Sequence, residues 1–346
     1  MPLRELAERI VPDNITYEEI QNARCLNQTL HVRLFNNGIM VRNGLRGETR
    51  HVELLEQLFK LRESGYRLPD TEFKYYTMDT VTADDIGPAN KESAIFSMFN
   101  DEKYDDLPRR ILAPTPFFSG YWSGKFGDKS EKVLYQDEMN RIINFSQERT
   151  MPFEKKLNAL MFKGTVYPYR KKLFDEIKDK ISTTSEFLIA EKGRGEKGAR
   201  VKEYQNPIEW CGTCRYQLVT DGAIRGGSEK IRSGTIRSMY MLATGSIVIY
   251  CSKEGHKKEW WQYAAEAEGL IQYCSSAEEV INIIRYFEDH PEEAHALSIR
   301  GIEFIKNFLS EENVLDFWKN LLDVYAERCD FEIREPAGQL MFWPDR

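Results

Sequence analysis

Residues 162–170, FKGTVYPYR, have the residue types and spacing of a phosphate-binding turn. A strand-like segment ends at Gly164 and Thr165, and the helix start that follows carries Arg170 about one turn in. Glycine lets the backbone approach an anion, threonine offers a hydroxyl group, and arginine can bind two phosphate oxygens at once. Glycine and threonine before a helix are also common capping residues, so this block alone is equally compatible with a structural role.

A second block with the same chemistry is TDGAIRGGSEKIRSGTIR, residues 220–237. Its candidate phosphate ligands flank a glycine-rich, basic loop and are Asp221, Gly222, Thr235 and Arg237. Arg225 and Arg232 within the loop are alternatives to Arg237. Neither block has the Gly-Lys-Ser/Thr ending of a Walker loop or the Gly-x-Gly-x-x-Gly of dinucleotide sites. Two arginines from adjacent units suit a diphosphate presented between domains.

A third block, Cys211-Gly-Thr-Cys214, has the spacing of a thioredoxin-like redox motif. Such a motif lies between a buried strand and a helix whose N-terminus lowers the pKa of the first thiol. Here a polar segment with a proline precedes the motif, and the strand-like RYQLVT follows it. A single cysteine pair also lacks the second pair that a structural zinc site needs. We therefore expect two thiols on a loop that enters a strand.

The elements that must position these blocks follow from the hydrophobic pattern. From Lys156 onward, the expected strands are 157–164, 186–191, 216–220, 246–252 and 270–274, and the expected helices are 167–181, 235–245 and 258–269. Ser276 and Glu279 then form a capping box for a long helical region. Strands that alternate with helices predict a parallel sheet covered on both faces. Helix N-termini gather at the carboxyl edge of such a sheet, so both phosphate blocks are expected there.

The N-terminal half has a different pattern. Residues 28–43 alternate apolar and polar side chains around Asn36-Asn37-Gly38, which predicts a β-hairpin. Residues 52–65 have helical spacing, and residues 71–79 are expected to form a strand that ends at Asp79. We expect two α/β domains with parallel sheets, divided near residue 150.

Composition argues against several classes of protein. A length of 346 residues is sufficient for two separate cores, and a net charge of −7 argues against bulk nucleic-acid binding. No apolar run reaches the length of a membrane span, and the N-terminus lacks the apolar core of a secretory signal. Six cysteines, mostly in apolar segments, fit reduced thiols. These features predict a cytoplasmic protein.

Beyond these patterns, residues 155–328 resemble glycosyltransferase family 90, which contains capsule-associated and Rumi-type sugar transferases. The resemblance rests on the order and spacing of FKGTVYPYR, RYQLVTDG, GTIRSMYMLATGSIVIY, EWWQY and the helical segment that begins SAEEVINII. There are three departures from the family pattern. One residue is deleted before Pro168. Lys163 stands where the family has an arginine, and AIRGGSEKIRSG lengthens the passage from Asp-Gly to the helix of Arg237.

The resemblance implies a GT-B fold, in which two Rossmann-like domains with parallel sheets face an interdomain cleft and the C-terminal helices cross back. The corresponding domains are 1–150 for the acceptor, 151–310 for the UDP-sugar, and a segment 311–346 that packs back on the N-terminal domain. The resemblance also implies an inverting transfer of xylose or glucose from a UDP-sugar to a hydroxyl group, without a metal or other cofactor. The acidic run 101–106 lies in a polar loop and is expected to be solvated.

Roles for individual residues follow from the same resemblance. Asp79 matches the family position of the general base on the acceptor side, and Asp84 and Asp85 are the nearest alternatives; Asp79 equally fits a turn-capping residue. Arg170 and Arg237 would neutralise the diphosphate. The residues expected to add N–H and hydroxyl contacts to the donor are Gly164, Thr165 and Thr235.

Acidic and aromatic side chains complete the candidate set. Glu254 and Glu259 follow the strand at 246–252, where GT-B enzymes often bind ribose or sugar hydroxyls, although each also fits a solvated surface acid. Trp122 is an acceptor-side candidate. The pair Trp260-Trp261 is expected in the core.

The expected partners are a UDP-sugar and a glycan acceptor, free or on a glycoprotein. Eukaryotic secretory members of the family carry a signal peptide and disulfides, whereas this chain shows neither, so we expect a microbial or viral enzyme that assembles glycans in the cytoplasm. Two alternatives stay open. One is a non-catalytic relative that binds a UDP-sugar or glycan without a working base, and the other is a thiol oxidoreductase that uses Cys211 and Cys214.

Overall fold

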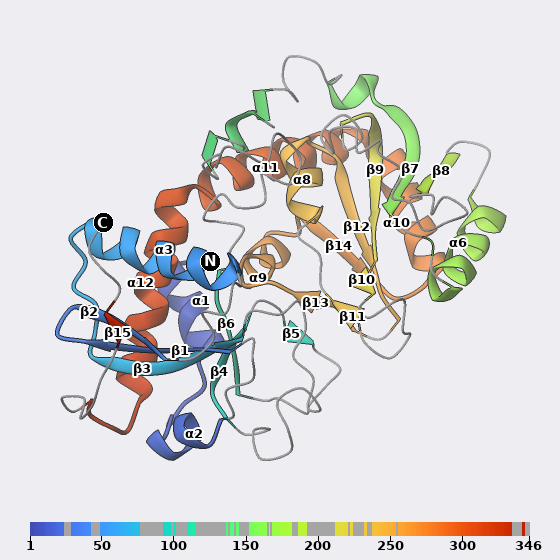
Figure 1. Cartoon of the computed structure of the whole chain (residues 1–346). Helices are drawn as coiled ribbons and strands as arrows, with labels where there is room; N and C mark the ends of the chain where they lie inside the picture. Colours follow the sequence, from blue (N-terminus) through green and yellow to red (C-terminus); the bar gives the residue numbers. More distant parts are fainter. Residues whose placement is uncertain are drawn as a thin grey trace. The chain divides into compact units, whose positions relative to one another are not determined.

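The computed structural model describes residues 1–23, 29–42, 49–76, 93–97, 100–101, 109–114, 136–137, 139–141, 143–144, 152–164, 166, 168–181, 186–191, 212–220, 222–223, 232–233, 237–253, 255–333 and 341–342. The chain forms two compact units, which Figure 1 shows in sequence colours. Unit 1 comprises Met1–Trp122, Lys258–Ala264 and Glu311–Arg346, and unit 2 comprises Ser123–Lys257 and Ala265–Ser310. The expected segment 311–346 thus belongs to unit 1, and the division expected near residue 150 lies inside unit 2.

Unit 1 contains a six-stranded sheet with the order β15-β2-β1-β3-β4-β6. Its strands are β1 (Thr29–Phe35), β2 (Gly38–Arg42), β3 (Thr71–Tyr76), β4 (Ile95–Ser97), β6 (Arg110–Leu112) and β15 (Met341–Phe342). Its helices are α1 (Leu3–Ile10), α2 (Tyr17–Asn22), α3 (Thr49–Glu63) and α12 (Glu311–Arg328).

The expectation of a parallel sheet in the N-terminal half is only partly correct. Strands β3, β4 and β6 are parallel, but β15, β2, β1 and β3 pair in antiparallel fashion. The cause is the predicted hairpin, which the structure confirms. Asn36 and Asn37 have φ values of 48° and 61°, the left-handed conformations of a two-residue hairpin turn, and so short a turn can join only antiparallel strands.

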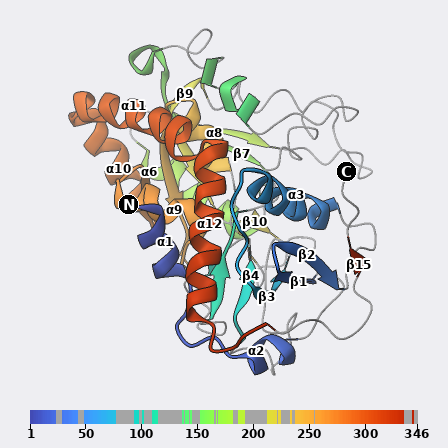
Figure 2. The same cartoon turned by 90° about the vertical axis from the view of Figure 1, so that its left-hand side faces the viewer.

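The C-terminal helix α12 completes the core of unit 1. The rings of Phe73 and Phe96 on the sheet pack against Tyr325, and Phe96 also stacks on Trp318. Tyr325 Oη donates a hydrogen bond to the backbone oxygen of Glu72 at 2.8 Å. Figure 2 shows α12 running alongside α1 and the strands of the sheet. Elements from both ends of the chain therefore share one hydrophobic core.

Unit 2 contains a five-stranded sheet with the order β14-β12-β9-β7-β8, and all its pairings are parallel. Its strands are β7 (Leu157–Gly164), β8 (Glu186–Glu191), β9 (Cys214–Val219), β12 (Ile247–Cys251) and β14 (Ile271–Cys274). Its helices are α6 (Pro168–Lys180), α8 (Arg237–Ala243), α10 (Ala277–Asp289) and α11 (Pro291–Phe308). The predicted parallel sheet is confirmed here, and every residue of β12 is buried, as a strand covered on both faces requires.

The remaining elements are shorter: helix α9 (Trp260–Ala267), the 3-10 helix η4 (Phe153–Lys155), and strands β5 (Asn100–Asp101), β10 (Gly222–Ala223), β11 (Arg232–Ser233) and β13 (Lys257–Lys258). The predicted cap of α10 is present, because Ser276 Oγ accepts a hydrogen bond from the backbone N–H of Glu279 at 3.2 Å. The Glu279 carboxylate accepts from the backbone N–H of Ser275, one residue earlier than a standard capping box places it.

Successive strands of unit 2 are first added on one side of β7 and then on the other. After β7 the chain moves outward to β8, and then β9 lies on the opposite side of β7, followed outward by β12 and β14. Because parallel crossovers are right-handed, α6 and α8 cover opposite faces of the sheet. Helix α10 packs with α6, and α11 packs with α8 (Figure 1).

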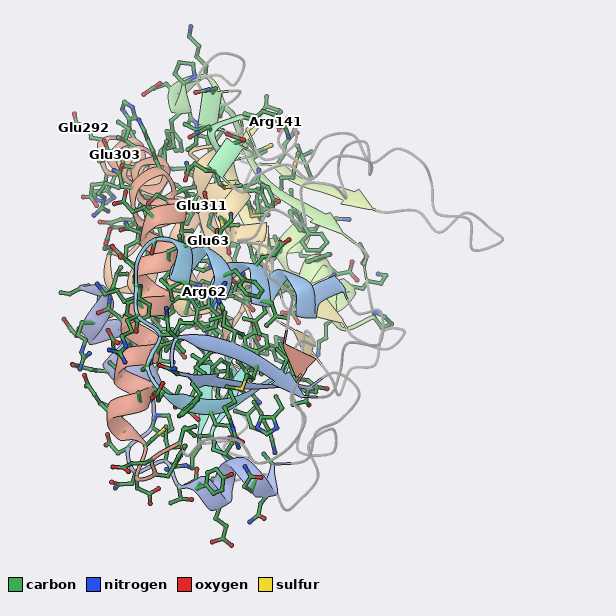
Figure 3. All side chains as sticks on the ribbon, turned by 60° about the vertical axis from the view of Figure 1, so that its left-hand side comes forward. Arg62, Glu63, Arg141, Glu292, Glu303 and Glu311 are labelled. Carbon is green, nitrogen blue, oxygen red and sulfur yellow. The ribbon has the colours of Figure 1, made fainter. Side chains whose placement is uncertain are left out.

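Helix α11 illustrates how the outer layer meets solvent. Leu297, Phe304 and Ile305 are buried on its inner side. Glu292 and Glu303 are exposed, and Figure 3 shows both on the outer side of the helix. This division is the expected pattern of a helix that covers a sheet.

Candidate functional site

The reversal in strand order puts a switch point between β7 and β9. Ligands of open α/β sheets bind in the crevice at the carboxyl ends of the two strands where the strand order reverses. In this chain the residues that follow those two strands are the phosphate blocks predicted from the sequence, Gly164 to Arg170 after β7 and Thr220 to Arg237 after β9. The sheet therefore brings the described starts of the two blocks, Gly164 and Thr220, to one edge.

Gly164 closes β7 in a conformation that favours glycine. Its φ is 153°, in a region that residues with a side chain rarely adopt. Helix α6 begins four residues later at Pro168, whose missing N–H is tolerated in the first turn of a helix. The strand, glycine and helix of the first block are thus arranged as the sequence predicts.

Arg170 is the third residue of α6 and is only 6% exposed. Its guanidinium carbon lies 5.3 Å from the centre of the Phe162 ring on β7, a cation–π contact that holds the side chain against the sheet. A cation in the first turn of a helix faces the positive end of the helix dipole, and burial removes its hydration. An anion at this edge would offset both unfavourable effects.

Thr220, directly after β9, is a candidate that the sequence analysis missed. The side chain is buried, and within the described part of the chain its hydroxyl group has no hydrogen-bond partner, which is rare for a buried polar atom. The last residue pair of the β7–β9 register is Met161 with Gln217. If this register continues for three residues, Thr220 lies opposite Gly164. The sequence feature that could have identified Thr220 is its position between a buried strand and an Asp-Gly pair.

The two ends of the long insertion before Arg237 lie side by side. Gly222 pairs with Ser233, and Ala223 pairs with Arg232, in an antiparallel β10–β11 hairpin. The two ends of the glycine-rich, basic loop are therefore adjacent, and α8 begins at Arg237 only four residues after the hairpin closes. The insertion accordingly does not carry the start of α8 away from the Asp-Gly end of β9.

Helix α8 is anchored firmly at its far end. Lys156 is buried, and its Nζ donates hydrogen bonds to the backbone oxygens of Gly212 at 2.9 Å and Thr244 at 2.7 Å. Ser298 Oγ donates to the backbone oxygen of Gly245 at 2.8 Å. Cationic and hydroxyl donors at a helix C-terminus satisfy carbonyl groups that have no partner within the helix. These contacts fix the position of a helix of only seven residues.

Glu259, in unit 1, is fully buried, so the interpretation as a surface acid is wrong for this residue. Burial raises the pKa of its carboxyl group to about 8, and the nearby Trp261 side chain offsets only part of that effect. The neighbouring Trp260 is also fully buried and stacks on Phe317 at 4.1 Å between ring centres. Trp260 and Trp261 are therefore core residues, as expected.

Cys214 does not have the surroundings of a redox-active thiol. It is the first residue of β9 and is fully buried. Burial raises the pKa of its thiol, and the Thr213 hydroxyl and the Lys156 ammonium group offset only part of that effect. A raised pKa disfavours the thiolate that such chemistry needs. The oxidoreductase alternative thus finds no support at this residue.

Several predicted residues lie outside the described part of the chain: Asp79, Asp84, Asp85, Trp122, Thr165, Cys211, Asp221, Arg225, Thr235 and Glu254. Their assignments stay predictions. The described residues contain no group of three or more His, Cys, Asp or Glu side chains that could hold a metal ion. Of the helices that the structure describes, none has the length and apolar character needed to cross a membrane.

Comparison with protein families gives one match. The family model described as glycosyl transferase family 90 matches residues 8–345, nearly the whole chain. No curated protein matches the sequence. The match covers both units and both phosphate blocks.

Proposed function

Because the chain belongs to glycosyl transferase family 90, we propose that it transfers xylose or glucose from a UDP-sugar to a hydroxyl group of a glycan, free or on a glycoprotein, with inversion at the sugar and without a metal ion. Membership of the family supports a sugar donor and an acceptor. The finer points, which are the donor, the stereochemistry and the independence from metal, belong to the proposal.

One observation carries the donor side of this proposal. The switch point of the parallel sheet lies between β7 and β9, and both strands lead into glycine-containing blocks with an arginine near a helix start. This edge supplies backbone N–H groups, the Thr220 hydroxyl group and the Arg170 guanidinium group. A nucleoside diphosphate needs such donors for its phosphate oxygens.

In the proposed reaction, the acceptor hydroxyl attacks C1 of the sugar from the face opposite UDP. The bond between C1 and the diphosphate oxygen breaks, and negative charge develops on UDP. Arg170 and Arg237 would stabilise that charge, since preorganised cations and N–H groups act most strongly where water is excluded. Exclusion of water also limits hydrolysis of the donor.

Asp79 is the proposed general base, which takes the proton from the acceptor hydroxyl as the new bond forms. Glu254 is the proposed contact to a hydroxyl group of the donor. Glu259 is fully buried in unit 1 and is not proposed for this role.

The test is release of UDP from a panel of UDP-sugars, with EDTA present and no acceptor added. We expect slow hydrolysis of UDP-xylose or UDP-glucose. Arg237→Ala should lower that rate by about 10²- to 10³-fold, the usual effect of removing one donor that stabilises charge in the transition state. Arg300→Ala is the matched control, because Arg300 is exposed on α11 and its loss should leave the rate unchanged.

Other outcomes separate the alternatives. If UDP raises the melting temperature but no donor is hydrolysed, even with a glycan acceptor present, the chain is a non-catalytic relative, and Asp79→Asn will change nothing. If UDP neither raises the melting temperature nor is released from any donor, the proposed donor site is wrong. If a folded Arg237→Ala protein hydrolyses the donor at an unchanged rate, Arg237 does not stabilise the diphosphate. Arg225 or Arg232 then becomes the candidate for that role.

A further inference from the structure

Two cysteines lie side by side at the carboxyl edge of the sheet in unit 2. Cys251 is the last residue of β12, Cys274 is the last residue of β14, and the parallel register pairs one with the other. Paired residues of neighbouring parallel strands point to the same face of the sheet. Strands lie about 4.8 Å apart, within the range of roughly 4.4–6.8 Å that separates the Cα atoms of disulfide-bonded cysteines.

The two cysteines are paired across the strands and largely shielded from solvent. Both thiols are free, and the residues are 2% and 5% exposed. Cys274 Sγ donates a hydrogen bond to the backbone oxygen of Tyr250, the residue before Cys251, at 3.8 Å. Formation of a bond between the sulfurs therefore needs only local movement at two strand ends.

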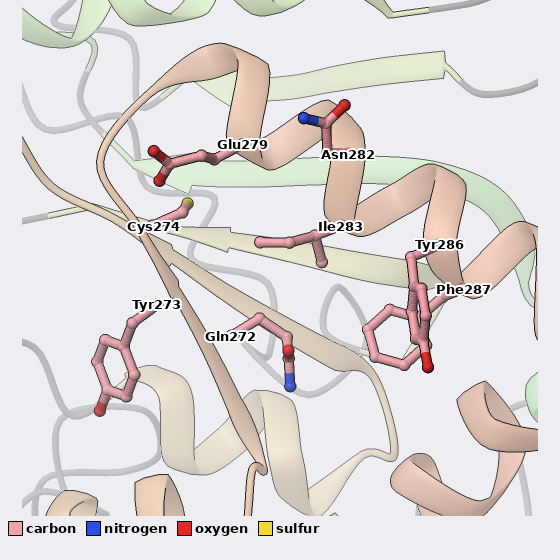
Figure 4. A pocket seen from close by; sticks show the side chains of 8 residues that line it. All are labelled: Gln272, Tyr273, Cys274, Glu279, Asn282, Ile283, Tyr286 and Phe287. Carbon is pink, nitrogen blue, oxygen red and sulfur yellow. The ribbon is translucent and has the colours of Figure 1, made fainter.

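Cys274 borders a pocket. The pocket has a volume of about 480 Å³, and Gln272, Glu279 and Ile283 also line it. Figure 4 shows the Cys274 sulfur beside the Glu279 carboxylate at the start of α10. A pocket of this size admits the end of a small thiol reagent, and Cys251 is not among the residues that line it.

We propose that Cys251 and Cys274 form a thiol–disulfide modification site that a low-molecular-weight disulfide oxidises through this pocket. Cys274 loses its proton to solvent and attacks one sulfur of the reagent, whose S–S bond breaks and releases one small thiol. Cys251 then loses its proton, attacks the Cys274 sulfur and releases the second small thiol. Two protein thiols and one small disulfide thus become one protein disulfide and two small thiols.

The surroundings make the reaction slow and the product reversible. The Cys251 thiol, burial and the Glu279 carboxylate all raise the pKa of the Cys274 thiol, so the reactive thiolate is scarce. The product is reversible because a small thiol in excess can attack the disulfide and reverse both exchange steps. Such a site responds to sustained oxidation and reverts with thiols.

The modification lies at an edge that matters for the proposed donor site, although the chemistry of the pair does not depend on that site. The backbone N–H of Ser252 donates to the Cys274 backbone oxygen, and His256 Nε2 lies 2.9 Å from that oxygen. A bond between the strand ends therefore holds the start of the loop that leads to Glu259. This is the same carboxyl edge at which β7 and β9 end.

Peptide mapping of the oxidised full-length chain tests the proposal. The reduced protein is incubated with oxidised glutathione, remaining thiols are alkylated, and trypsin digestion follows without reductant. Cys251 falls in peptide 238–253 and Cys274 in peptide 259–285, while Cys211 and Cys214 share peptide 203–215. We expect 238–253 linked to 259–285, with the loss of two hydrogen atoms in mass, and release of both peptides by dithiothreitol.

Two variants and one denatured sample check the route. Cys251→Ser should stop the reaction after its first step, so Cys274 accumulates as a mixed disulfide with glutathione. Cys329→Ser is the control and should form the same cross-link as the natural chain. Unfolding in guanidinium chloride before oxidation should abolish the preference for this pair. The proposal is overturned if both peptides are recovered alkylated, or each carries glutathione without a cross-link, in the folded natural chain.

Discussion

Among single residues, Glu259 has surroundings that its sequence position does not reveal. It stands in a polar stretch, GHKKEWWQY, that is typical of an exposed helix start, yet the carboxyl group is fully buried. Its backbone N–H donates to the Gln262 side chain at 2.8 Å, so Glu259 sits where α9 begins and is buried with it. Burial of a carboxyl group favours its neutral form, which couples this residue to pH.

The free energy of unfolding should fall as pH rises from 5 to 8, and we expect Glu259→Gln to make this fall smaller. The pKa of this carboxyl group is 4.5 in an ordinary setting and about 8 in the folded protein, because burial raises it. The folded state therefore holds a proton that the unfolded state has released, and the free energy of unfolding falls as pH rises through this window. The fall from this one group is at most about 1.4 kcal/mol per pH unit, and glutamine removes it.

Urea unfolding at pH 5, 6, 7 and 8 measures this effect. Glu268→Gln is the matched control, because Glu268 is exposed and its replacement should leave the pH profile as it is. A Glu259→Gln protein whose stability declines as steeply as that of the natural chain would show that this carboxyl group is ionised in the folded state. Below pH 4.5 the free energy of unfolding should change with pH in the same way in the natural chain and in Glu259→Gln.

At the scale of elements, α8 and α9 end in the same way but in different surroundings. Gly245 and Gly269 both have φ of 66° and close a helix with the paired hydrogen bonds of a Schellman motif. A Cβ atom on Gly245 would lie 2.8 Å from Ser298 Oγ and 2.9 Å from Ile302 Cδ1, whereas a Cβ atom on Gly269 would meet nothing within 4 Å. The first glycine therefore serves both backbone conformation and close packing of α11 on α8.

This pair of glycines separates conformation from packing. Gly269→Ala should cost only the left-handed conformation, about 1–2 kcal/mol. Gly245→Ala adds a clash with α11, and we expect a further loss of about 1–3 kcal/mol. Urea unfolding of the two variants under the same conditions compares them. Equal losses would mean that α11 yields to the added methyl group and that the contact between α8 and α11 is loose.

At the scale of the whole molecule, the last helix stabilises the first unit. Trp318 on α12 is fully buried, stacks near Phe96, and donates from Nε1 to the Gln57 side chain on α3 at 2.6 Å. Residues more than 200 positions apart thus depend on one another. Part of the apolar surface of the sheet and of α3 is therefore covered by a helix from the far end of the chain.

We expect Trp318→Ala to reduce the free energy of unfolding by about 3–5 kcal/mol, because it leaves a cavity and removes the hydrogen bond to Gln57 Oε1. Ile299→Ala is the control. Ile299 is 45% exposed on α11, and its truncation should change stability by less than about 1 kcal/mol. Equilibrium denaturation of both variants provides the measurement. A small effect at Trp318 would mean that unit 1 can close its core without α12.

Much of unit 2 could be predicted from local pattern. Strands and helices from residue 157 onward alternate with clear periodicity, and the Ser276 cap and the Asn36-Asn37 hairpin depend on neighbours in sequence. Such features need only short-range interactions, so they are visible in one sequence. The mixed sheet of unit 1 was harder, because the pairing of β1 with β3 joins segments separated by more than thirty residues.

The candidate site divides in the same way. The sequence determined its residue types, and glycine, threonine and arginine around strand ends suit the proposed phosphate site. Which strands are neighbours was decided only by the tertiary structure, because hydrogen bonding between distant segments sets the order β14-β12-β9-β7-β8. That order creates the switch point, makes Thr220 a candidate and pairs Cys251 with Cys274. No local pattern encodes it, since adjacency of strands depends on hydrogen bonds between segments that are distant in sequence.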